Sequence, residues 1–244
     1  MNARLQSAQP EPYVLDDQQA IGQIAVQLPG ATAIFRRHKL DFCCGGQVSL
    51  AQAASEKGLD PAALMRELAA IQRTDAPLEY DSAGALIDHI LQRYHAVHRE
   101  QLPELIRMAR RVEAVHRDHP LVPAGLADLL EAAEQDLLDH MVKEENILFP
   151  MLKAGGNPFV SSPIGVMRAE HTQHGAMLEQ LMALSNNASP PQGACNTWRA
   201  LYSGIAQLHD DLINHIHLEN NVLFNQFDAP TPKPTKSACC GSCG

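Results

Sequence analysis

Apolar residues recur at helical spacing in four long stretches of the chain, at 83–116, 124–152, 164–186 and 197–227. The connections between these stretches contain Pro, Gly or Asn. Long helices joined by short connections are typical of antiparallel bundles. Pro103 lies inside the first stretch, where it predicts a kink or a break into two helices. The pattern therefore predicts an all-α protein with an antiparallel four-helix bundle over residues 83–227.

Shorter helical patterns precede the bundle. Apolar residues share one helical face at 21–28, and further short helices are expected at 31–37, 50–54 and 61–71. We therefore expect a small helical domain over residues 14–75 that contains the cysteine motif CCGG, with a linker at 74–77. Prolines and a polar composition predict a flexible leader at 1–13 and a disordered, cysteine-containing tail at 228–244.

Charge and hydropathy exclude several classes of function. The 244 residues carry a formal net charge of −9 and no Lys/Arg-rich block, which argues against nucleic-acid binding. No run of eighteen apolar residues is present, so no membrane span is expected. The N-terminus does not resemble a secretory signal, and we expect a cytoplasmic protein with reduced thiols.

An internal repeat is the strongest signal of function. The pattern H-x-x-x-E-x-N-x-L-F occurs at 140–149 and again at 215–224, and an H-x-x-H pattern occurs at 95–98 and 171–174. Each half of the bundle therefore offers one helix with HxxH and one with HxxxE. A single HxxxE is usually a surface ion pair. Two copies with matching flanks and spacing instead indicate side chains at one level of a pseudo-twofold bundle.

The spacing of the repeat suits a dinuclear metal site. Residues four apart lie one above the other on a helix, so an imidazole and a carboxylate can reach one metal centre. A carboxylate can also bridge two metals, and nitrogen and oxygen ligands without sulfur fit iron or manganese better than structural zinc. The predicted ligands are His95, His140, Glu144, His171, His215 and Glu219.

The residues next to the predicted ligands are given lesser roles. His98 and His174 are expected beside the ligands or at the surface. Glu145 follows Glu144 directly, so its side chain is expected to point about 100° away from the site. Glu170 and Asp136 are weak candidates for lining the pocket. The other histidines are expected to be solvated or structural: His89, His116, His119, His209 and His217.

Six cysteines are unevenly spaced and do not form a disulfide framework. Cys43 and Cys44 precede two glycines, which predicts an exposed turn whose thiolates accept iron, react with nitric oxide or relay electrons. The alternative is that they only pack the small domain. The CxxC of the tail, Cys240 to Cys243, is a weak signal that suits a transient metal site, a redox disulfide or no function at all.

These motifs resemble those of a known family. The stretches concerned are DFCCGG at 41–46, IDHILQRYHAVHREQLPEL at 87–105, HMVKEENILFPM at 140–151 and HIHLENNVLF at 215–224. The bundle resembles the haemerythrin-like fold. Residues 14–227 as a whole resemble the Repair of Iron Centres di-iron proteins, which protect and restore iron–sulfur clusters under nitrosative and oxidative stress.

The resemblance implies an oxo- and carboxylate-bridged centre of two iron ions, held by the same six residues with Glu144 and Glu219 bridging. It implies damaged iron–sulfur proteins as partners and nitric oxide or O₂ as small ligands, and it leaves a homodimer open. Oxygen-carrying haemerythrins typically have a further histidine four residues after the one that corresponds to His171. Here that position is Gly175, which favours reactivity over reversible O₂ carriage.

The sequence therefore supports iron–sulfur cluster repair by iron delivery as the first hypothesis. Reduction of nitric oxide to N₂O at a diferrous site is an enzymatic alternative, because two ferrous ions hold the two electrons that couple two nitric oxide molecules. A carrier or sensor of O₂ or nitric oxide is the third hypothesis. Such a protein has no evident need for Cys43 and Cys44, so the small domain distinguishes this class from the others.

Overall fold

The computed structural model describes residues 14–28, 30–71 and 80–228, and these form helices, turns and one isolated β-bridge between Ala20 and Ser49. The predicted all-α fold is confirmed. The predicted leader at 1–13, linker at 74–77 and tail with its CxxC lie outside the described residues, apart from Asp228. None of the described helices is both long and apolar enough to cross a membrane.

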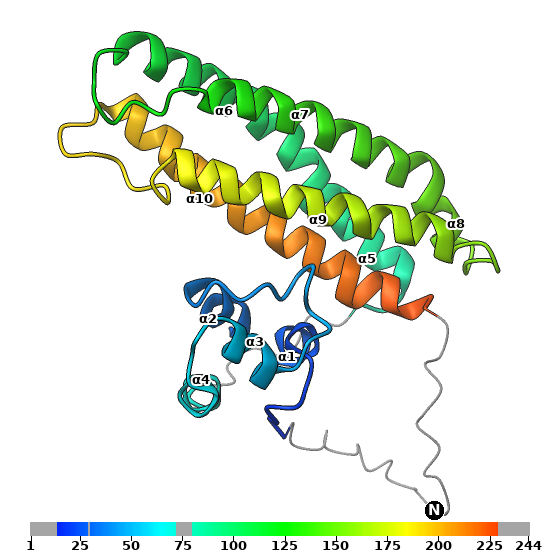
Figure 1. Ribbon diagram of the computed structural model, residues 1–244. Coiled ribbons are helices and arrows are strands. Elements are labelled where there is room, and N and C mark those ends of the chain that lie inside the picture. Colours follow the sequence, from blue (N-terminus) through cyan, green and yellow to red (C-terminus); the bar gives the residue numbers. More distant parts are fainter. Residues whose placement is uncertain (1–13, 29, 72–79, 229–244) are drawn as a thin grey trace, which may run out of the picture.

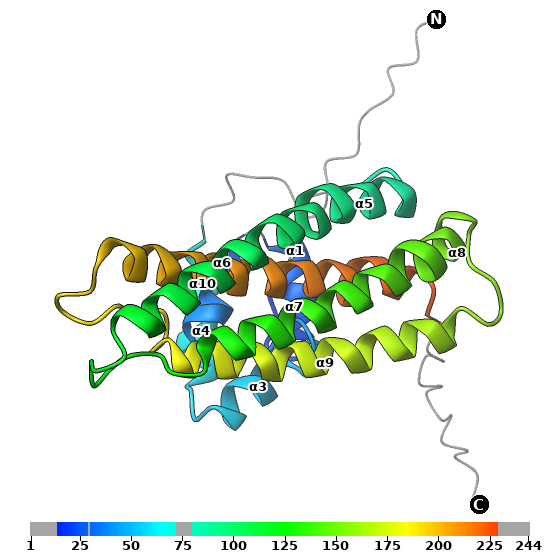
Figure 2. The same cartoon turned by 90° about the horizontal axis from the view of Figure 1, so that it is seen from above.

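Four antiparallel helices form the bundle (Figures 1 and 2), and α6 packs against α7 and α10, while α9 packs against the same two helices. Short segments extend these helices at the end of the bundle that carries the α8 label. The bundle elements are α5 (Ala83–Ile90), η1 (Leu91–His95), α6 (Ala96–Val115), α7 (Leu126–Lys143), η2 (Glu144–Leu148), α8 (Phe149–Lys153), α9 (Ser161–Leu184), α10 (Asn196–His217), η3 (Leu218–Leu223) and η4 (Phe224–Gln226).

Of the two alternatives expected at Pro103, a kink or a break, the break is wrong, because α6 runs without interruption from Ala96 to Val115 with Pro103 inside it. Proline removes one backbone hydrogen bond, and the packing of α6 against α7 and α10 holds the helix together around that loss. The irregular segment of this helix lies earlier, at η1, where five residues form a wider π-helical turn.

Three π-helical segments occur in the described chain, and each contains a predicted metal ligand. His95 ends η1, Glu144 begins η2, and Glu219 is the second residue of η3. A π-turn places one extra residue in a helical turn and is frequent at functional sites. The sequence pattern did not predict these turns, because hydrophobic periodicity does not resolve a shift of one residue.

The small domain consists of four short helices, α1 (Ile21–Gln27), α2 (Ala31–Arg37), α3 (Leu50–Glu56) and α4 (Pro61–Ala69). The side chain of Ser49 caps α3 and that of Asp60 caps α4, which stabilises the first turn of each helix. The domain has an apolar core of its own, made mainly of Ile, Leu, Phe and Ala side chains.

The small domain packs against α10 and η3 of the bundle (Figure 1). The Asn221 side chain donates to the carbonyl oxygen of Phe42 at 3.2 Å, and the Asn220 side chain donates to that of Cys43 at 3.0 Å. Gly22 and Gly46 face Asn221 so closely that an added Cβ on either glycine would clash with its side chain. Two asparagines of the bundle therefore hold the turn at residues 41–46 that contains Cys43 and Cys44, which we call the cysteine turn.

The bundle contains two apolar clusters rather than one continuous core. One cluster includes Leu105, Leu130 and Leu208, and the other includes Leu86, Phe149 and buried side chains near the end of α8. Each of the four long helical segments contributes to both clusters and carries polar residues between its two contributions. The predicted ligands therefore occupy a polar layer that is closed by apolar side chains on both sides.

Replacing Gly46 by alanine should destabilise the docked small domain. The new Cβ would meet the Phe42 carbonyl oxygen and would lie 2.9 Å from Asn221 Oδ1, and backbone cannot move away cheaply. We expect a loss of about 1–3 kcal/mol of unfolding free energy, measured by chemical denaturation.

The matched control is Gly165→Ala on α9, where an added Cβ meets no atom within 4 Å. Because alanine has the higher helix propensity, this variant should gain about 0.5–1 kcal/mol. Equal effects of the two substitutions would contradict the close packing inferred at the cysteine turn.

Candidate metal centre

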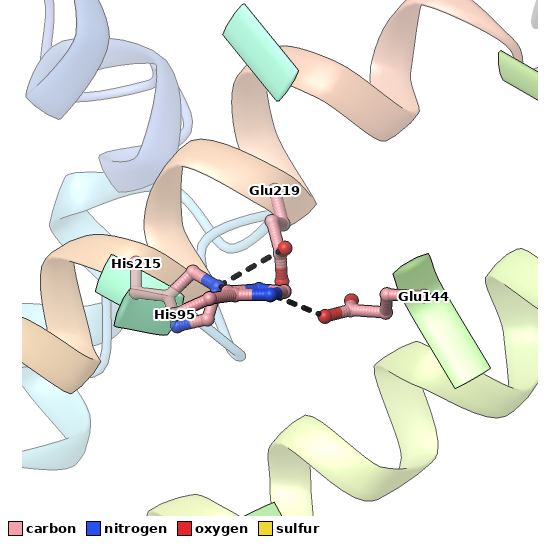
Figure 3. A group of neighbouring side chains, drawn as sticks. All are labelled: His95, Glu144, His215 and Glu219. Carbon is pink, nitrogen blue, oxygen red and sulfur yellow. Dashed lines mark hydrogen bonds and ion pairs between the residues drawn. The ribbon is translucent and has the colours of Figure 1, made fainter. Parts of the chain in front are cut away.

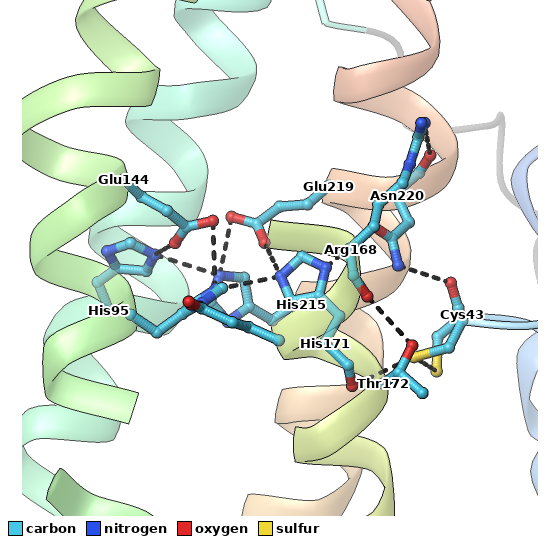
Figure 4. Close-up of polar contacts among 12 residues, drawn as sticks. Cys43, His95, Glu144, Arg168, His171, Thr172, His215, Glu219 and Asn220 are labelled. Carbon is cyan, nitrogen blue, oxygen red and sulfur yellow. Dashed lines mark hydrogen bonds and ion pairs between the residues drawn. The ribbon is translucent and has the colours of Figure 1, made fainter. Parts of the chain in front are cut away.

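The six side chains that the repeat singles out meet in the polar layer of the bundle, and all of them except His140 are labelled in Figure 4. They come from all four long helical segments, and each is at most 1% exposed. The π-turns and α9 set their positions along the axis, so that nitrogen and oxygen atoms converge on one small region. The contributing residues are His95, His140, Glu144, His171, His215 and Glu219.

The side chains form two groups, and both carboxylates belong to both groups. One group combines Glu144 and Glu219 with His95 and His215 (Figure 3), and the other combines the same carboxylates with His140 and His171. Within each group the potential ligand atoms lie within 4.8 Å of one another. The arrangement therefore offers two neighbouring positions for cations, each with two imidazoles.

Each carboxylate directs one oxygen toward each group. In Glu144, Oε2 lies 3.3 Å from His95 Nε2 and Oε1 lies 3.3 Å from His140 Nε2. In Glu219, Oε1 lies 3.1 Å from His215 Nε2 and Oε2 lies 3.0 Å from His171 Nε2. This is the orientation that a carboxylate needs to bridge two metal ions.

The outer nitrogen of three of the imidazoles donates to an oxygen behind it. The distances are 2.8 Å from His95 Nδ1 to Glu145 Oε1, 2.8 Å from His140 Nδ1 to Glu170 Oε2, and 2.9 Å from His171 Nδ1 to Asn220 Oδ1. A donating Nδ1–H leaves Nε2 as the nitrogen that can carry a free lone pair. These bonds therefore orient the rings with Nε2 toward the centre of the site.

Two of these hydrogen-bond acceptors, Glu145 and Asn220, were not assigned to the site from the sequence. Glu145 does point away from the presumed ions, but it reaches the back of His95, because an imidazole presents two nitrogens in opposite directions. Asn220 was missed. Both residues directly follow a predicted bridging glutamate, so the repeat already contained the signal. Glu170 is confirmed at the edge of the site, whereas Asp136 is exposed.

The histidines next to the ligands are buried rather than at the surface. His98 is fully buried, and neither of its ring nitrogens has a hydrogen bond within the described chain. Burial lowers the pKa of His98 to about 2 and that of His174 to about 3, so both rings are neutral at neutral pH. The ring of Tyr94 stacks on that of His215 at 5.2 Å, which supports the one ligand whose Nδ1 lacks a hydrogen bond in this part of the structure.

Charges within the site raise the pKa of two of its imidazoles, His95 and His140, whereas burial lowers the pKa of His215. Burial alone would lower the pKa of His140, but the nearby Glu144 carboxylate outweighs burial and raises this pKa to about 9. Burial also opposes protonation of His95, and the contacts with Glu144 again raise its pKa. Without cations, the site therefore retains protons on imidazoles at neutral pH.

The two carboxylates are ionised in spite of complete burial. Burial and the mutual repulsion with Glu219 raise the pKa of Glu144, but the contacts with His140 and His95 outweigh both and lower it. The pKa of Glu219 is held well below its ordinary value, because the contacts with His215 and His171 outweigh burial. Both buried carboxylates therefore carry negative charge at neutral pH.

The residues fit a pair of metal cations. Neither oxygen of Glu144 makes a hydrogen bond within the described chain, although the side chain is fully buried. The Nε2 atoms of His95 and His215 face each other at 3.2 Å, and those of His140 and His171 at 3.1 Å. Buried carboxylates without hydrogen bonds and facing imidazole nitrogens are both satisfied by divalent cations.

The cysteine turn of the small domain lies next to α9 at the level of the site. Cys44 Sγ donates to the His171 carbonyl oxygen at 3.4 Å, and it lies 3.9 Å from the position that a Cβ on Gly175 would take. Asp41 joins Cys43 and Cys44 in a further group of potential metal ligands. The Cys44 thiol therefore lies beside Gly175 of α9.

The expectation of an exposed cysteine turn is wrong for Cys43, which is only 7% exposed, whereas Cys44 is half-buried. The hydrogen bond with Cys44, together with burial, raises the pKa of the Cys43 thiol far above its ordinary range. Packing of the turn against α9 and η3 is the physical reason, and in this arrangement Cys43 is a protonated thiol.

Two family models match the chain. Residues 86–227 match the hemerythrin HHE cation binding domain, and residues 17–72 match ScdA_N, a domain of unknown function (DUF542). The first match covers all six side chains of the candidate site, and the second covers the cysteine turn.

Relatives with assigned names match most of the chain. Iron-sulfur cluster repair protein YtfE of Cronobacter sakazakii is 50% identical over 210 residues, which are 84% of this chain and 94% of that protein. The YtfE proteins of Citrobacter koseri and Escherichia coli O157:H7 are 50% and 49% identical over the same lengths and shares. The similarity thus extends over both parts of the structure.

Replacing Glu219 by alanine should abolish metal binding at both positions, since this carboxylate belongs to both groups. Replacing His140 by alanine removes a ligand from one group only, and should lower metal content to about one ion per chain or less. Elemental analysis of anaerobically purified protein measures both effects. The matched control is His209→Ala, which changes a histidine of α10 outside the site; metal loss in this variant would contradict the assignment.

Loading the metal-free protein with ferrous iron at pH 7 should release protons. Because His140 has a pKa of about 9 in the empty site, its proton must leave before Nε2 can bind a metal. We expect about one to two protons per chain, measured anaerobically as the dependence of the calorimetric heat on the ionisation enthalpy of the buffer.

Proton release should decline as the pH rises above about 9, where His140 is already neutral. Binding heats that do not depend on the buffer at pH 7 would show that the empty site carries no such proton.

Proposed function

The chain belongs to the family of iron–sulfur cluster repair proteins that carry a hemerythrin HHE cation binding domain, and on that premise we propose that it repairs iron–sulfur clusters damaged by nitrosative or oxidative stress. The observation that carries the proposal is a buried cage of four imidazoles and two shared carboxylates, with a cysteine turn packed on one of its helices. Damaged iron–sulfur proteins are then the partners of the chain.

The cage holds a di-iron centre in this proposal. His95 and His215 would hold one iron and His140 and His171 the other, with Glu144 and Glu219 shared between the two positions. Two iron ions supply exchangeable ferrous iron and two electrons when bound. Nitrogen and oxygen ligands without thiolate, in a site with fewer than six protein ligands per ion, support iron that can be released.

The protein residues around the cage control retention and release. The hydrogen bonds from the ligand rings to Glu145, Glu170 and Asn220 keep Nε2 directed inward. The apolar clusters on both sides exclude bulk water. Once an iron ion has left, His140 takes up a proton, because the ionised Glu144 beside it favours the charged ring. Protonation of the ligand then opposes rebinding and favours net delivery.

Cys43 and Cys44 receive the released iron or exchange electrons in this proposal. Cys44 is the more exposed of the two thiols, and its Sγ contacts the backbone of His171. Asp41 Oδ1 accepts from the Cys44 amide at 2.9 Å and lies 3.3 Å from Cys43 Sγ, so a carboxylate and two thiols share one turn. We therefore assign the first contact to Cys44, with Cys43 following once it is deprotonated.

Reduction of nitric oxide is the alternative function. Two cation positions share both carboxylates, so a diferrous centre held there would supply the two electrons, and position 175 of α9 is a glycine rather than a further histidine. The overall reaction takes two nitric oxide molecules, two electrons and two protons to N₂O and water. Reversible carriage or sensing of O₂ or nitric oxide is the further class, and it would not need the cysteine turn.

Holo-protein should restore the activity of an enzyme whose iron–sulfur cluster has been damaged by nitric oxide, and should exceed an equal concentration of free ferrous iron. We expect Cys44→Ser to lower the initial rate of recovery by about tenfold, with its metal content unchanged. Recovery of activity and iron content of the client are measured together.

His209→Ala is the matched control and should repair as well as wild type, whereas Glu219→Ala should repair no better than buffer. Recovery no greater than with free iron would refute repair by delivery.

Release of N₂O by the diferrous protein in a single turnover, above that of the metal-free protein, would favour the enzymatic alternative. Full retention of ligand binding after deletion of residues 1–75, without repair or N₂O, would favour a carrier.

A further inference from the structure

A thiol and an imidazole meet at the opposite end of the bundle from the polar layer. Cys195 precedes α10 as its N-cap residue, and His116 follows α6 as its C-cap residue. Cys195 Sγ lies 3.2 Å from His116 Nε2, which is hydrogen-bond distance for a thiol and a ring nitrogen. The larger apolar cluster separates this pair from the metal centre.

The Cys195 side chain is available for reaction. It makes no capping hydrogen bond to the first turn of α10, so its sulfur is not committed to the helix backbone. The residue is half-buried and lines a cleft of about 330 Å³. A half-buried thiol at the edge of a cleft can be reached by a molecule from solution.

Packing holds the His116 ring against the thiol. The His116 ring lies 5.0 Å from the ring of the buried Trp198, and the His119 ring lies 5.2 Å from the same indole. Of these two histidines, His116 is the one that has a hydrogen bond with Cys195. The two histidines thus share one packing partner, and they differ in their contact with sulfur.

Two geometric features suit Cys195 to nucleophilic chemistry. His116 Nε2 lies within hydrogen-bond distance of its sulfur, and the sulfur stands at the N-terminus of the 22-residue helix α10, where the helix dipole is positive. Cysteines at helix N-termini beside an imidazole are the common arrangement of reactive thiols. The sequence pattern does not link Cys195 to His116, because the two residues lie 79 positions apart.

The cleft also carries a cation. Arg111 lines it, is exposed, and has no ion pair with any residue of the described chain. A guanidinium recognises a carboxylate through paired hydrogen bonds. The remaining lining includes Val112, Val115, Asn196 and Thr197, so the cleft combines one positive group with a thiol and with both apolar and polar side chains.

We propose that Cys195 is a site of thiol–disulfide exchange with a low-molecular-weight disulfide that carries carboxylates. The Sγ–H proton passes to His116 Nε2, and the thiolate attacks one sulfur of the disulfide. A bond forms between that sulfur and Cys195 Sγ while the disulfide bond breaks, and the leaving thiolate takes the proton from His116. Cys195 is oxidised, half of the disulfide is reduced to a thiol, and no other oxidant is needed.

The test uses full-length, iron-loaded protein and glutathione disulfide at neutral pH, with peptide mapping by mass spectrometry to separate Cys195 from the other five cysteines. Wild type should form the mixed disulfide on Cys195. His116→Gln and His116→Asn should both slow this reaction by about tenfold, and His119→Gln should leave it unchanged. Circular dichroism and iron content verify that each variant is folded.

Cystamine, a disulfide with amines in place of carboxylates, serves as the control probe. Wild type should react faster with glutathione disulfide than with cystamine, and Arg111→Gln should remove that preference while keeping the cystamine rate. No adduct on Cys195 in the folded protein, although the unfolded protein reacts, would overturn the proposal. So would rates of both His116 variants within about twofold of wild type.

Discussion

The burial of two ionised carboxylates at the centre of a helical bundle is the constraint on which the rest of the structure depends. An ionised carboxylate without a partner in a protein interior costs on the order of several kcal/mol, and here Glu144 and Glu219 are both fully buried and close together. Four imidazoles surround them, one on each oxygen. In the absence of cations, the protons retained by His140 and His95 partly offset the negative charge. The same oxygen and nitrogen atoms are the candidate ligands of the proposed cations.

The bundle is organised to keep this polar layer both dry and oriented. Each long helical segment contributes apolar residues to a cluster on one side of the layer and to another cluster on the other side. The π-turns at η1, η2 and η3 supply the extra residue that brings a ligand of each segment to the same level. Behind the rings, Glu145, Glu170 and Asn220 accept hydrogen bonds, so the inward direction of Nε2 is set by protein atoms.

Asn220 connects this layer to the small domain. Its Oδ1 accepts from the ring of His171, and its Nδ2 donates to the carbonyl oxygen of Cys43. One amide thus holds a ligand of the centre and the backbone of the cysteine turn at the same time. Cys44 contacts the backbone of His171 from the same side, where Gly175 leaves room. The small domain is therefore positioned by the groups that also position the centre.

The sequence by itself determined the helical fold class and the six side chains that meet in the layer. Both follow from periodicity, because helical spacing fixes which residues share a face, and a repeated HxxxE fixes which faces carry ligands. The repeat also held the signal for Glu145 and Asn220, since each directly follows a predicted bridging glutamate. Tertiary structure alone decided the continuity of α6 through Pro103, the burial of Cys43, and the contact between Cys195 and His116. Each depends on packing between residues that are distant in the chain, and no local pattern encodes such packing.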